Sequence, residues 1–224
     1  MTGTLINAAA VLVGTVLGVL IGDRLPERIR ETVFHALGLV TLLMGVANGI
    51  EAFGPELAQV TRVAPIVVLG SILLGGVLGE ALGVERGLNR FGDALKARVG
   101  RGQARFTEGF VVATLLFCVG PLAIIGSIQD GLSGNLQILG VKSLLDGFAA
   151  LAFASALGWG VGFSIIPIVL YQGALSLSAG AVAGIFTEAV VAALTGAGGI
   201  LIVGIALRLL DLREVRVANL LPAL

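Results

Sequence analysis

The amino-acid sequence predicts an all-α, polytopic membrane protein, built as a transmembrane helical bundle of about seven crossings. Only 12% of the 224 residues are charged and the mean hydropathy is +1.05, whereas a soluble domain carries roughly 25% charged residues. A bilayer core about 30 Å thick takes about 20 apolar residues as helix. Five uncharged runs are near or above that length, and the fourth is long enough for two crossings: 1–22, 63–79, 109–129, 147–187 and 189–207.

Glycine is the other unusual feature of the composition. The chain holds 34 glycines, although Gly costs about 1 kcal/mol relative to Ala in a soluble helix. In lipid, small residues let helix backbones approach closely, whereas a membrane barrel would show alternating segments of about 10 residues. The composition therefore predicts helices packed on one another. The stripe of Gly14, Gly18 and Gly22 suits either a homodimer seam or packing inside one protomer.

The first three predicted crossings cover about 5–21, 33–50 and 63–82. A polar stretch, 23–31, separates the first two, and the most polar segment of the chain, 85–105, follows the third. That segment carries six Lys/Arg, and its apolar residues recur at the spacing of one helix face. It is therefore predicted to be an amphipathic helix lying on the cytoplasmic surface of the membrane.

The fourth predicted crossing, about 109–127, is interrupted by Gly120 and Pro121. A turn is predicted over 129–135, because this stretch is rich in Gly, Asp, Ser and Asn. The fifth and sixth crossings follow at about 141–157 and 163–177, separated by a glycine-rich break.

The remainder, 179–212, allows two interpretations. It is either one long helix after an irregular connection, which gives seven crossings, or two short helices split at 196–199, which give eight.

The distribution of positive charge favours seven crossings. Cytoplasmic loops carry an excess of Lys/Arg, so 23–31 and 85–105 are predicted inside, and the loops 51–62 and 128–139, with one and none, outside. This places the N-terminus outside and the arginine-rich C-terminus in the cytoplasm, which requires an odd number of crossings. A multi-pass protein of a bacterial inner (plasma) membrane is expected.

The chain is expected to form a single integral membrane domain, 1–224, with an internal repeat. Residues 18–25 line up with 75–82, since both end a glycine-rich helix and place an acid after its last glycine. The predicted repeat units are 1–60 and 61–130, and 131–224 is the remainder. Internal repeats are common in transporter folds.

Ionisable side chains at membrane depth are costly and mark candidate sites. Asp146 lies about one turn inside the fifth crossing, and Lys142 precedes it by four residues, which puts both on one helix face. Either they form a buried pair that exchanges partners during transport, or Lys142 reaches the outer interface and Asp146 merely neutralises it. Glu188 would lie mid-membrane with eight crossings and near the outer surface with seven.

Polar side chains beside helix breaks are further candidates. Gln129 and Asp130 follow the broken fourth helix, whose freed backbone groups could face a substrate, or they belong to a plain turn. Gln172 follows Pro167 in the sixth crossing, where it either contacts a substrate or hydrogen-bonds a neighbouring helix. For Asn7 in the first crossing, the helix–helix hydrogen bond is the favoured interpretation.

Other classes of protein find no support in the sequence. There is no His/Cys/acid cluster with metal-ligand spacing, no Gly-Lys-Ser/Thr phosphate loop and no nucleophile–base pair. An enzyme, a metal and a cofactor are therefore not expected. With zero net charge and no basic patch with aromatics, nucleic acid is not an expected partner.

Several motifs resemble those of a known family, the YqgA/YdfK-like bacterial membrane proteins with domain of unknown function 554. The matching stretches, which span essentially the whole chain, are 3–7, 113–121, 126–131, 142–147, 171–173 and 217–222. The resemblance implies an inner-membrane location and a transport role, and it supplies no substrate. The polar positions in these motifs are Ser127, Gln129, Asp130, Lys142, Asp146 and Gln172.

Two functions follow as expectations. The first is a secondary transporter or channel for a small polar solute or ion, with a path beside the broken fourth helix. The second is a non-transporting scaffold or sensor that docks membrane lipid or a partner through its basic amphipathic helix.

Overall fold

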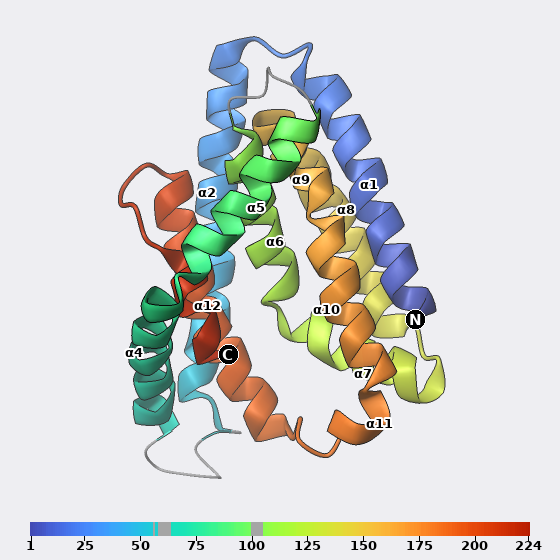
Figure 1. Ribbon diagram of the computed structural model, residues 1–224, viewed down its shortest axis with the longest axis vertical. Coiled ribbons are helices and arrows are strands. Elements are labelled where there is room, and N and C mark those ends of the chain that lie inside the picture. The colour runs from blue at the N-terminus through green and yellow to red at the C-terminus, as the bar shows by residue number, and fades with distance from the viewer. Residues whose placement is uncertain (56, 58–63, 100–104) are drawn as a thin grey trace. The chain divides into compact units, whose positions relative to one another are not determined.

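The computed structural model describes residues 1–55, 57, 64–99 and 105–224, and every regular element within these ranges is helical (Figure 1). The predicted all-α class is therefore confirmed. In chain order the elements are α1 (Thr2–Gly22), α2 (Glu27–Ile50), η1 (Glu51–Phe53), α4 (Ala64–Leu82), α5 (Val84–Val99), α6 (Phe106–Cys118), α7 (Pro121–Ser133), α8 (Gln137–Leu157), α9 (Gly160–Phe163), α10 (Ile165–Leu177), α11 (Ala179–Val182), α12 (Glu188–Leu209) and η2 (Val217–Ala223).

Six described helical segments are long and apolar enough to cross a membrane, and a seventh is added if the bent pair α6–α7 makes one crossing. The chain is thus a membrane protein with several spans. The helix α12 runs without interruption through Gly196–Gly199. The alternative of two short helices there, and with it eight crossings, is wrong for this structure.

The chain divides into two compact units, each assembled from segments that are distant in the sequence. Unit 1 comprises Met1–Phe34 and Arg90–Gly184, and unit 2 comprises His35–Asn89 and Ile185–Leu224. These borders differ from those of the proposed repeat, which stays a prediction.

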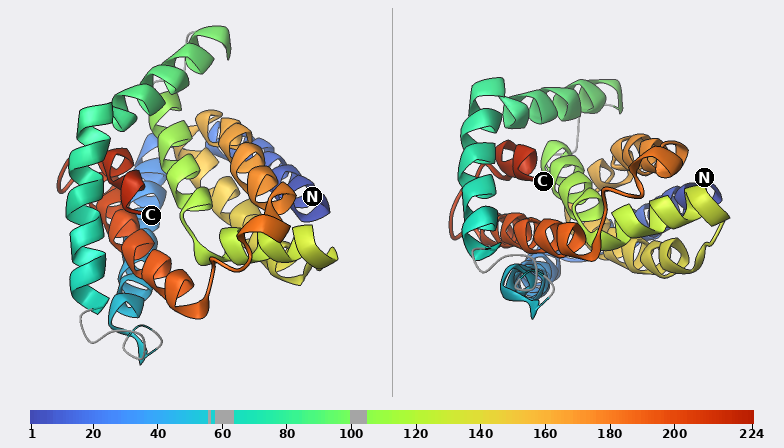
Figure 2. Two further views of the ribbon diagram at one scale, coloured as in Figure 1. Left: turned by 60° about the horizontal axis from the view of Figure 1, so that its bottom comes forward. Right: turned by 90° about the horizontal axis from the view of Figure 1, so that it is seen from below.

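Unit 1 contains the closest helix pair, α1 and α8, which lie side by side (Figures 1 and 2). A Cβ atom added to any glycine of the α1 stripe would collide with a backbone carbonyl of α8. The pairs are Gly14 with Gly147, Gly18 with Leu151 and Gly22 with Ser155. Both members advance by four residues, so the helices are parallel, as expected for the first and fifth crossings. The stripe therefore packs inside one protomer, and its face is not open for a homodimer seam.

The helix predicted as the fourth crossing is broken at the position that the sequence indicates. Gly120 has an extended backbone, Pro121 begins α7, and the two helices meet at 62° (Figure 2). The break has a local cause, since proline disfavours a helical conformation in the residue before it and is itself well suited to a first helical turn.

The predicted turn over 129–135 is wrong in its first half. The helix α7 continues to Ser133, and Gly134 ends it with a left-handed backbone, φ +66°. Glycine adopts this conformation at a helix end without steric cost. Gln129 and Asp130 therefore lie on a helix, where their side chains have fixed directions.

Unit 2 combines α4 and α12 with the C-terminal element η2. Gly75 and Gly79 of α4 allow η2 to lie directly on it, because Cβ atoms there would collide with the backbone of Ala223 and Asn219. The short 3₁₀ helix is not among the elements that the sequence predicts, since it has no long apolar run.

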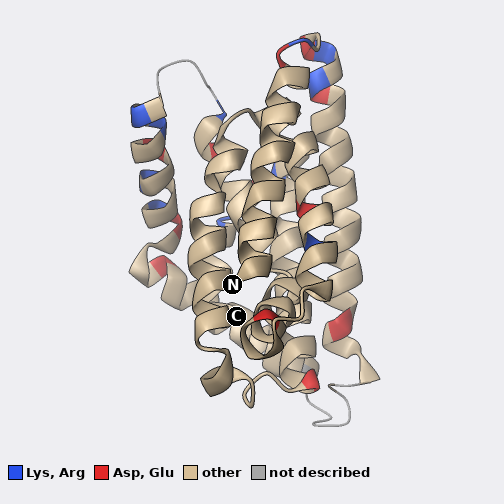
Figure 3. Cartoon of the chain, turned by 90° about the vertical axis from the view of Figure 1, so that its right-hand side faces the viewer, with Lys and Arg blue, Asp and Glu red and all other residues tan. Residues whose placement is uncertain are grey.

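The amphipathic helix is present as α5, which carries charged residues along its length (Figure 3). Figure 3 also shows charges gathered in the connection between α1 and α2, whereas the bodies of the long helices carry few. The predicted continuation of this helix over 100–104 lies outside the described residues, as do residues 56 and 58–62 of the loop 51–62 and residue 63 of the third predicted crossing.

Candidate functional site

Three helices of unit 1 meet at a buried polar cluster. Asn7 of α1 donates from Nδ2 to Asp146 Oδ2 of α8 at 3.0 Å, and to Gln172 Oε1 of α10 at 3.4 Å. Lys142 forms an ion pair with the same Asp146 oxygen from one turn earlier on α8. Asn7, Lys142, Asp146 and Gln172 are called the polar cluster below.

Local helix geometry explains why these side chains meet. Lys142 and Asp146 are four residues apart and share one face of α8. Gln172 belongs to the buried stripe of α10, with Ile168 four residues before it and Ser176 four after. Asn7 lies on the buried face of α1 that carries the glycine stripe.

The ion pair is enclosed by protein. The side chains of Lys142 and Asp146 are only 5% and 11% exposed. In the structure Lys142 therefore does not extend to the membrane interface. Of the two arrangements, the structure contains the buried pair. Such a pair is stable only while both members are present, because a single buried charge is strongly unfavourable.

Unit 1 also contains unpartnered polar atoms, two of which belong to the polar cluster. Within the described residues, six buried side-chain atoms have no hydrogen-bond partner in the protein: Thr4 Oγ1, Asn7 Oδ1, Thr15 Oγ1, Thr114 Oγ1, Ser127 Oγ and Gln172 Nε2. All six belong to unit 1. Each such atom costs about 1–3 kcal/mol unless something else hydrogen-bonds to it. The interior of unit 1 is therefore suited to binding water or a polar solute.

The helix break lies beside the cluster. The helices on the two sides of the break, α6 and α7, both pack against α8 and α10, which carry three of the four cluster residues. Cys118 ends α6. The next residues lead into the N-terminus of α7, where helix N–H groups have no helical partner. Broken helices of this kind form solute sites in transporters.

The polar cluster falls within the stretches 3–7, 142–147 and 171–173, on which the family resemblance rests. Over residues 2–224 the chain matches the family described as "Protein of unknown function (DUF554)". The chain belongs to the DUF554 family. The resemblance seen in the sequence is thereby confirmed.

Two relatives match the DUF554 chain over nearly its whole length. "Uncharacterized protein YqgA" of Escherichia coli (strain K12) is 33% identical over 227 residues, covering 99% of this chain and 92% of the relative. "Uncharacterized membrane protein YdfK" of Bacillus subtilis (strain 168) is 26% identical over 224 residues, covering 100% and 93%. No solved structure matches the chain.

Asp130 of the DUF554 motif 126–131 has a different environment from the cluster. Its Oδ2 accepts a hydrogen bond from the backbone N–H of Gly3 at 3.1 Å and lies 3.0 Å from the Met1 amino group. Asp130 thus acts as an N-terminal cap of α1, supplied by another helix. A carboxylate there satisfies a free N–H group and interacts favourably with the helix dipole.

Replacing Asp130 by alanine is expected to lower the free energy of unfolding by about 1–2 kcal/mol, because the N-terminus of α1 loses its acceptor. The measurement is unfolding in mixed micelles of sodium dodecyl sulfate and dodecyl maltoside. Asp130→Asn keeps an acceptor oxygen and should lose less. Gln129→Ala, at the half-buried neighbouring position, is the control. Equal losses in all three variants would contradict the capping role.

The remaining predicted residues make no hydrogen bond to the described side chains of the polar cluster. Ser127 is fully buried in unit 1, and its backbone carbonyl accepts a hydrogen bond from Ser176 at 2.9 Å. Gln129 is half-buried. Glu188 is exposed, begins α12 and belongs to unit 2. Its mid-membrane placement is therefore wrong, because Thr187 caps a helix that starts there.

Thr4, Thr15 and Thr114 were not predicted as site residues from the sequence. A threonine in a membrane helix ordinarily bonds a carbonyl of its own helix, so its presence alone gives no signal. Asn7, for which a helix–helix hydrogen bond was predicted, makes two. The described residues contain no group of His, Cys, Asp and Glu arranged to hold a metal ion.

A cavity of about 370 Å³ lies in unit 1 at the C-terminal ends of α1 and α8. Its charged lining consists of three carboxylates and two guanidinium groups, from Asp23, Glu27, Glu31, Arg30 and Arg105. Both arginines have partners, since Arg30 donates to the Ala156 carbonyl at 3.2 Å and Arg105 stacks on the Phe34 ring. The three carboxylates are the groups that remain to face a solute.

Proposed function

We propose that this DUF554 protein is a secondary transporter or channel that moves a small polar solute or ion across a bacterial inner membrane through unit 1. The observation that carries the proposal is that unit 1 holds six unpartnered buried polar atoms among its described residues, together with a buried ion pair and a broken helix. A bundle that serves only as a scaffold has no reason to retain these groups, because apolar residues would pack there at lower cost.

A route follows the buried face of α1. Asn7, Val11, Thr15 and Val19 lie near one another on this face at steps of four residues, and Val19 lines the 370 Å³ cavity. Twelve residues of helix separate Asn7 from Val19, which is about 18 Å at 1.5 Å per residue. Thr15 provides a polar side chain between the cluster and the cavity, and Val11 lies between Thr15 and Asn7.

In the proposed orientation the N-terminus is outside and the C-terminus cytoplasmic, following the arginine-rich loops. The cavity at the C-terminal ends of α1 and α8 then opens to the cytoplasm. Asp146 interacts with the charge of the solute. Lys142 pairs with Asp146 when no solute is bound, and the solute can displace Lys142 from Asp146.

Asp146→Asn is expected to reduce solute flux at least about 10-fold. The variant loses a charge-assisted contact with the solute, and such a contact is worth roughly 1.5–3 kcal/mol. Proteoliposomes would be tested with potassium, sodium, chloride, neutral amino acids and, through an internal pH-sensitive dye, protons. Glu188→Gln, which removes an exposed acid from unit 2, is the matched control and should be silent. If Asp146→Asn transports a solute at the same rate as the unchanged protein, Asp146 has no part in the mechanism.

The basic face of α5 favours a second function, a membrane scaffold or sensor that docks lipid or a partner. Arg90 and Arg98 are exposed, and so are the apolar Phe91 and Val99 on the same helix. This combination is typical of helices that lie on an anionic membrane surface. If this is the function, neutralising Arg90, Lys96 and Arg98 abolishes it, while Asp146→Asn has no effect.

A further inference from the structure

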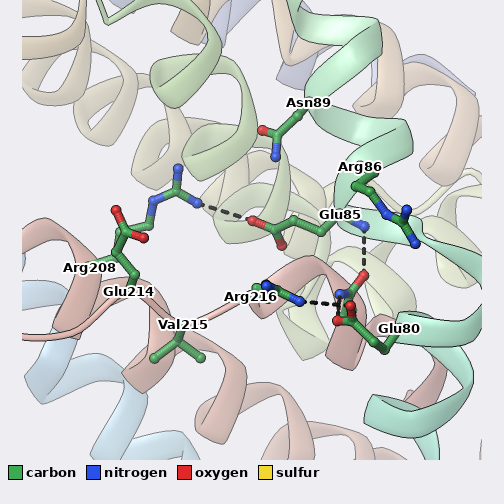
Figure 4. Close-up of a pocket in the computed structure, with 9 residues that line it drawn as sticks. Glu80, Glu85, Arg86, Asn89, Arg208, Glu214, Val215 and Arg216 are labelled. Atoms are coloured by element: carbon green, nitrogen blue, oxygen red, sulfur yellow. Dashed lines mark hydrogen bonds and ion pairs between the residues drawn. The ribbon is translucent and has the colours of Figure 1, made fainter.

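A second cavity, of about 530 Å³, lies in unit 2 and is lined mainly by charged and amide side chains (Figure 4). They come from the end of α4, the first turns of α5, the end of α12 and the C-terminal segment. The lining residues are Glu80, Glu85, Arg86, Asn89, Arg208, Glu214, Val215, Arg216 and Asn219.

Two of the three carboxylates in this cavity are already satisfied. Glu85 accepts from Arg208 Nη1 at 3.3 Å and from the Ala218 N–H at 2.8 Å, and its own N–H donates to Asn219 Oδ1 at 2.7 Å. Glu80 accepts from Arg216 Nη1 at 2.7 Å and from Asn219 Nδ2 at 2.6 Å. Each of their four oxygens has a protein donor, so they offer little to a ligand.

The donors in the cavity are in excess. A guanidinium has five N–H groups, and Arg208 and Arg216 each make one hydrogen bond to these carboxylates. Arg86 and Asn89, one turn apart on α5, make no hydrogen bond with any side chain of the described lining. Figure 4 shows Asn89 and Arg208 converging from different helices on the space beside Glu85.

We propose that this cavity binds a phosphate group. Three guanidinium groups and an amide offer more donors than the two oxygens of a carboxylate accept, whereas a phosphate presents three or four oxygens. Arginine also matches phosphate geometry through paired N–H···O bonds. The start of α5 contributes the positive end of a helix dipole. Glu214, the one carboxylate of the described lining that accepts no hydrogen bond, opposes an anion and weakens the site.

The phosphate has two sources. One is a soluble phosphate compound. The other is a phospholipid headgroup, because α4, which supplies Glu80, also carries the exposed apolar stripe Leu74, Leu78 and Leu82 along which acyl chains would lie.

Purified protein in dodecyl maltoside would be titrated calorimetrically with inorganic phosphate, glycerol 3-phosphate and short-chain phosphatidylglycerol. Arg86→Gln should weaken binding about 10-fold, because one charge-assisted hydrogen bond is worth roughly 1.5 kcal/mol or more. Glu214→Gln should strengthen binding, because it removes the opposing charge. Arg28→Gln takes the same charge from an exposed position of α2 in unit 1, which does not line the cavity, and should be silent.

Binding of the two soluble compounds identifies a solute site, and binding of phosphatidylglycerol alone identifies a lipid site. The proposal is overturned if none of the three binds, if Arg86→Gln binds like the unchanged protein, or if Glu214→Gln weakens binding, as a cationic ligand would require. Arg86 and Glu214 are both exposed, so neither variant is expected to disturb folding.

Discussion

Replacing Asp146 by leucine is expected to lower the free energy of unfolding by about 3 kcal/mol, because it leaves the Lys142 ammonium buried without a counter-ion. The side chain of Lys142 is 5% exposed, so water does not replace the lost carboxylate. Asn7 Nδ2 also loses one of its two acceptors and keeps only Gln172 Oε1. Unfolding in mixed micelles of sodium dodecyl sulfate and dodecyl maltoside measures the loss.

The matched control is the double variant Lys142→Met with Asp146→Leu. Apolar residues of similar size often replace a buried ion pair at little cost, so this variant should recover most of the lost stability. A stable double variant that no longer moves solute would separate the function of the pair from its structural role. If Asp146→Leu alone unfolds like the unchanged protein, the ammonium reaches water and the pair is not buried in solution.

Gly14→Ala should destabilise the protein by about 3 kcal/mol, at the upper end of the range for overpacked sites. The added Cβ would meet the carbonyl oxygen of Gly147, its carbon and the Leu151 nitrogen. These are backbone atoms, so no side-chain rotation relieves the collision. The helices α1 and α8 would have to separate, which would also move Asn7 away from Asp146. The same unfolding measurement applies, and solute flux should fall with stability.

Gly140→Ala is the control for this variant. Gly140 lies on α8, the partner helix, and a Cβ there meets no heavy atom within 4 Å. Alanine is also the better helix former by about 1 kcal/mol in water, so the variant should be neutral or slightly stabilised. Similar losses for Gly14→Ala and Gly140→Ala would show that the loss does not come from close contact between α1 and α8.

Much of the fold could be predicted because its causes are local. A helix that crosses lipid must satisfy its backbone hydrogen bonds internally and present apolar side chains, and both conditions act on one continuous segment. The break at Gly120–Pro121 is local in the same way. The error over 129–135 arose because glycine and polar residues suggested a turn, whereas only Gly134 adopts the backbone that ends the helix.

The candidate site could be predicted in part. Lys142 and Asp146 were predictable as a pair, since four-residue spacing alone puts them on one helix face. Their burial, and the presence of Asn7 and Gln172 beside them, were not. The latter two residues are 165 positions apart, and nothing in either segment indicates the other. The same holds for Glu85 and Asn219, which are 134 positions apart.

By itself the sequence determined that this chain is a helical membrane protein, where its helices run, and which polar residues are exceptional among apolar neighbours. Only the tertiary structure decided that the glycines of α1 face the carbonyls of α8, that Asp130 caps α1, and that six buried polar atoms among the described residues of unit 1 lack protein partners. The physical reason is that lipid acts on each helix separately, whereas hydrogen bonds and close packing depend on which helices meet. Which helices meet depends on how the faces of whole helices fit one another, and these helices come from segments that are distant in the sequence.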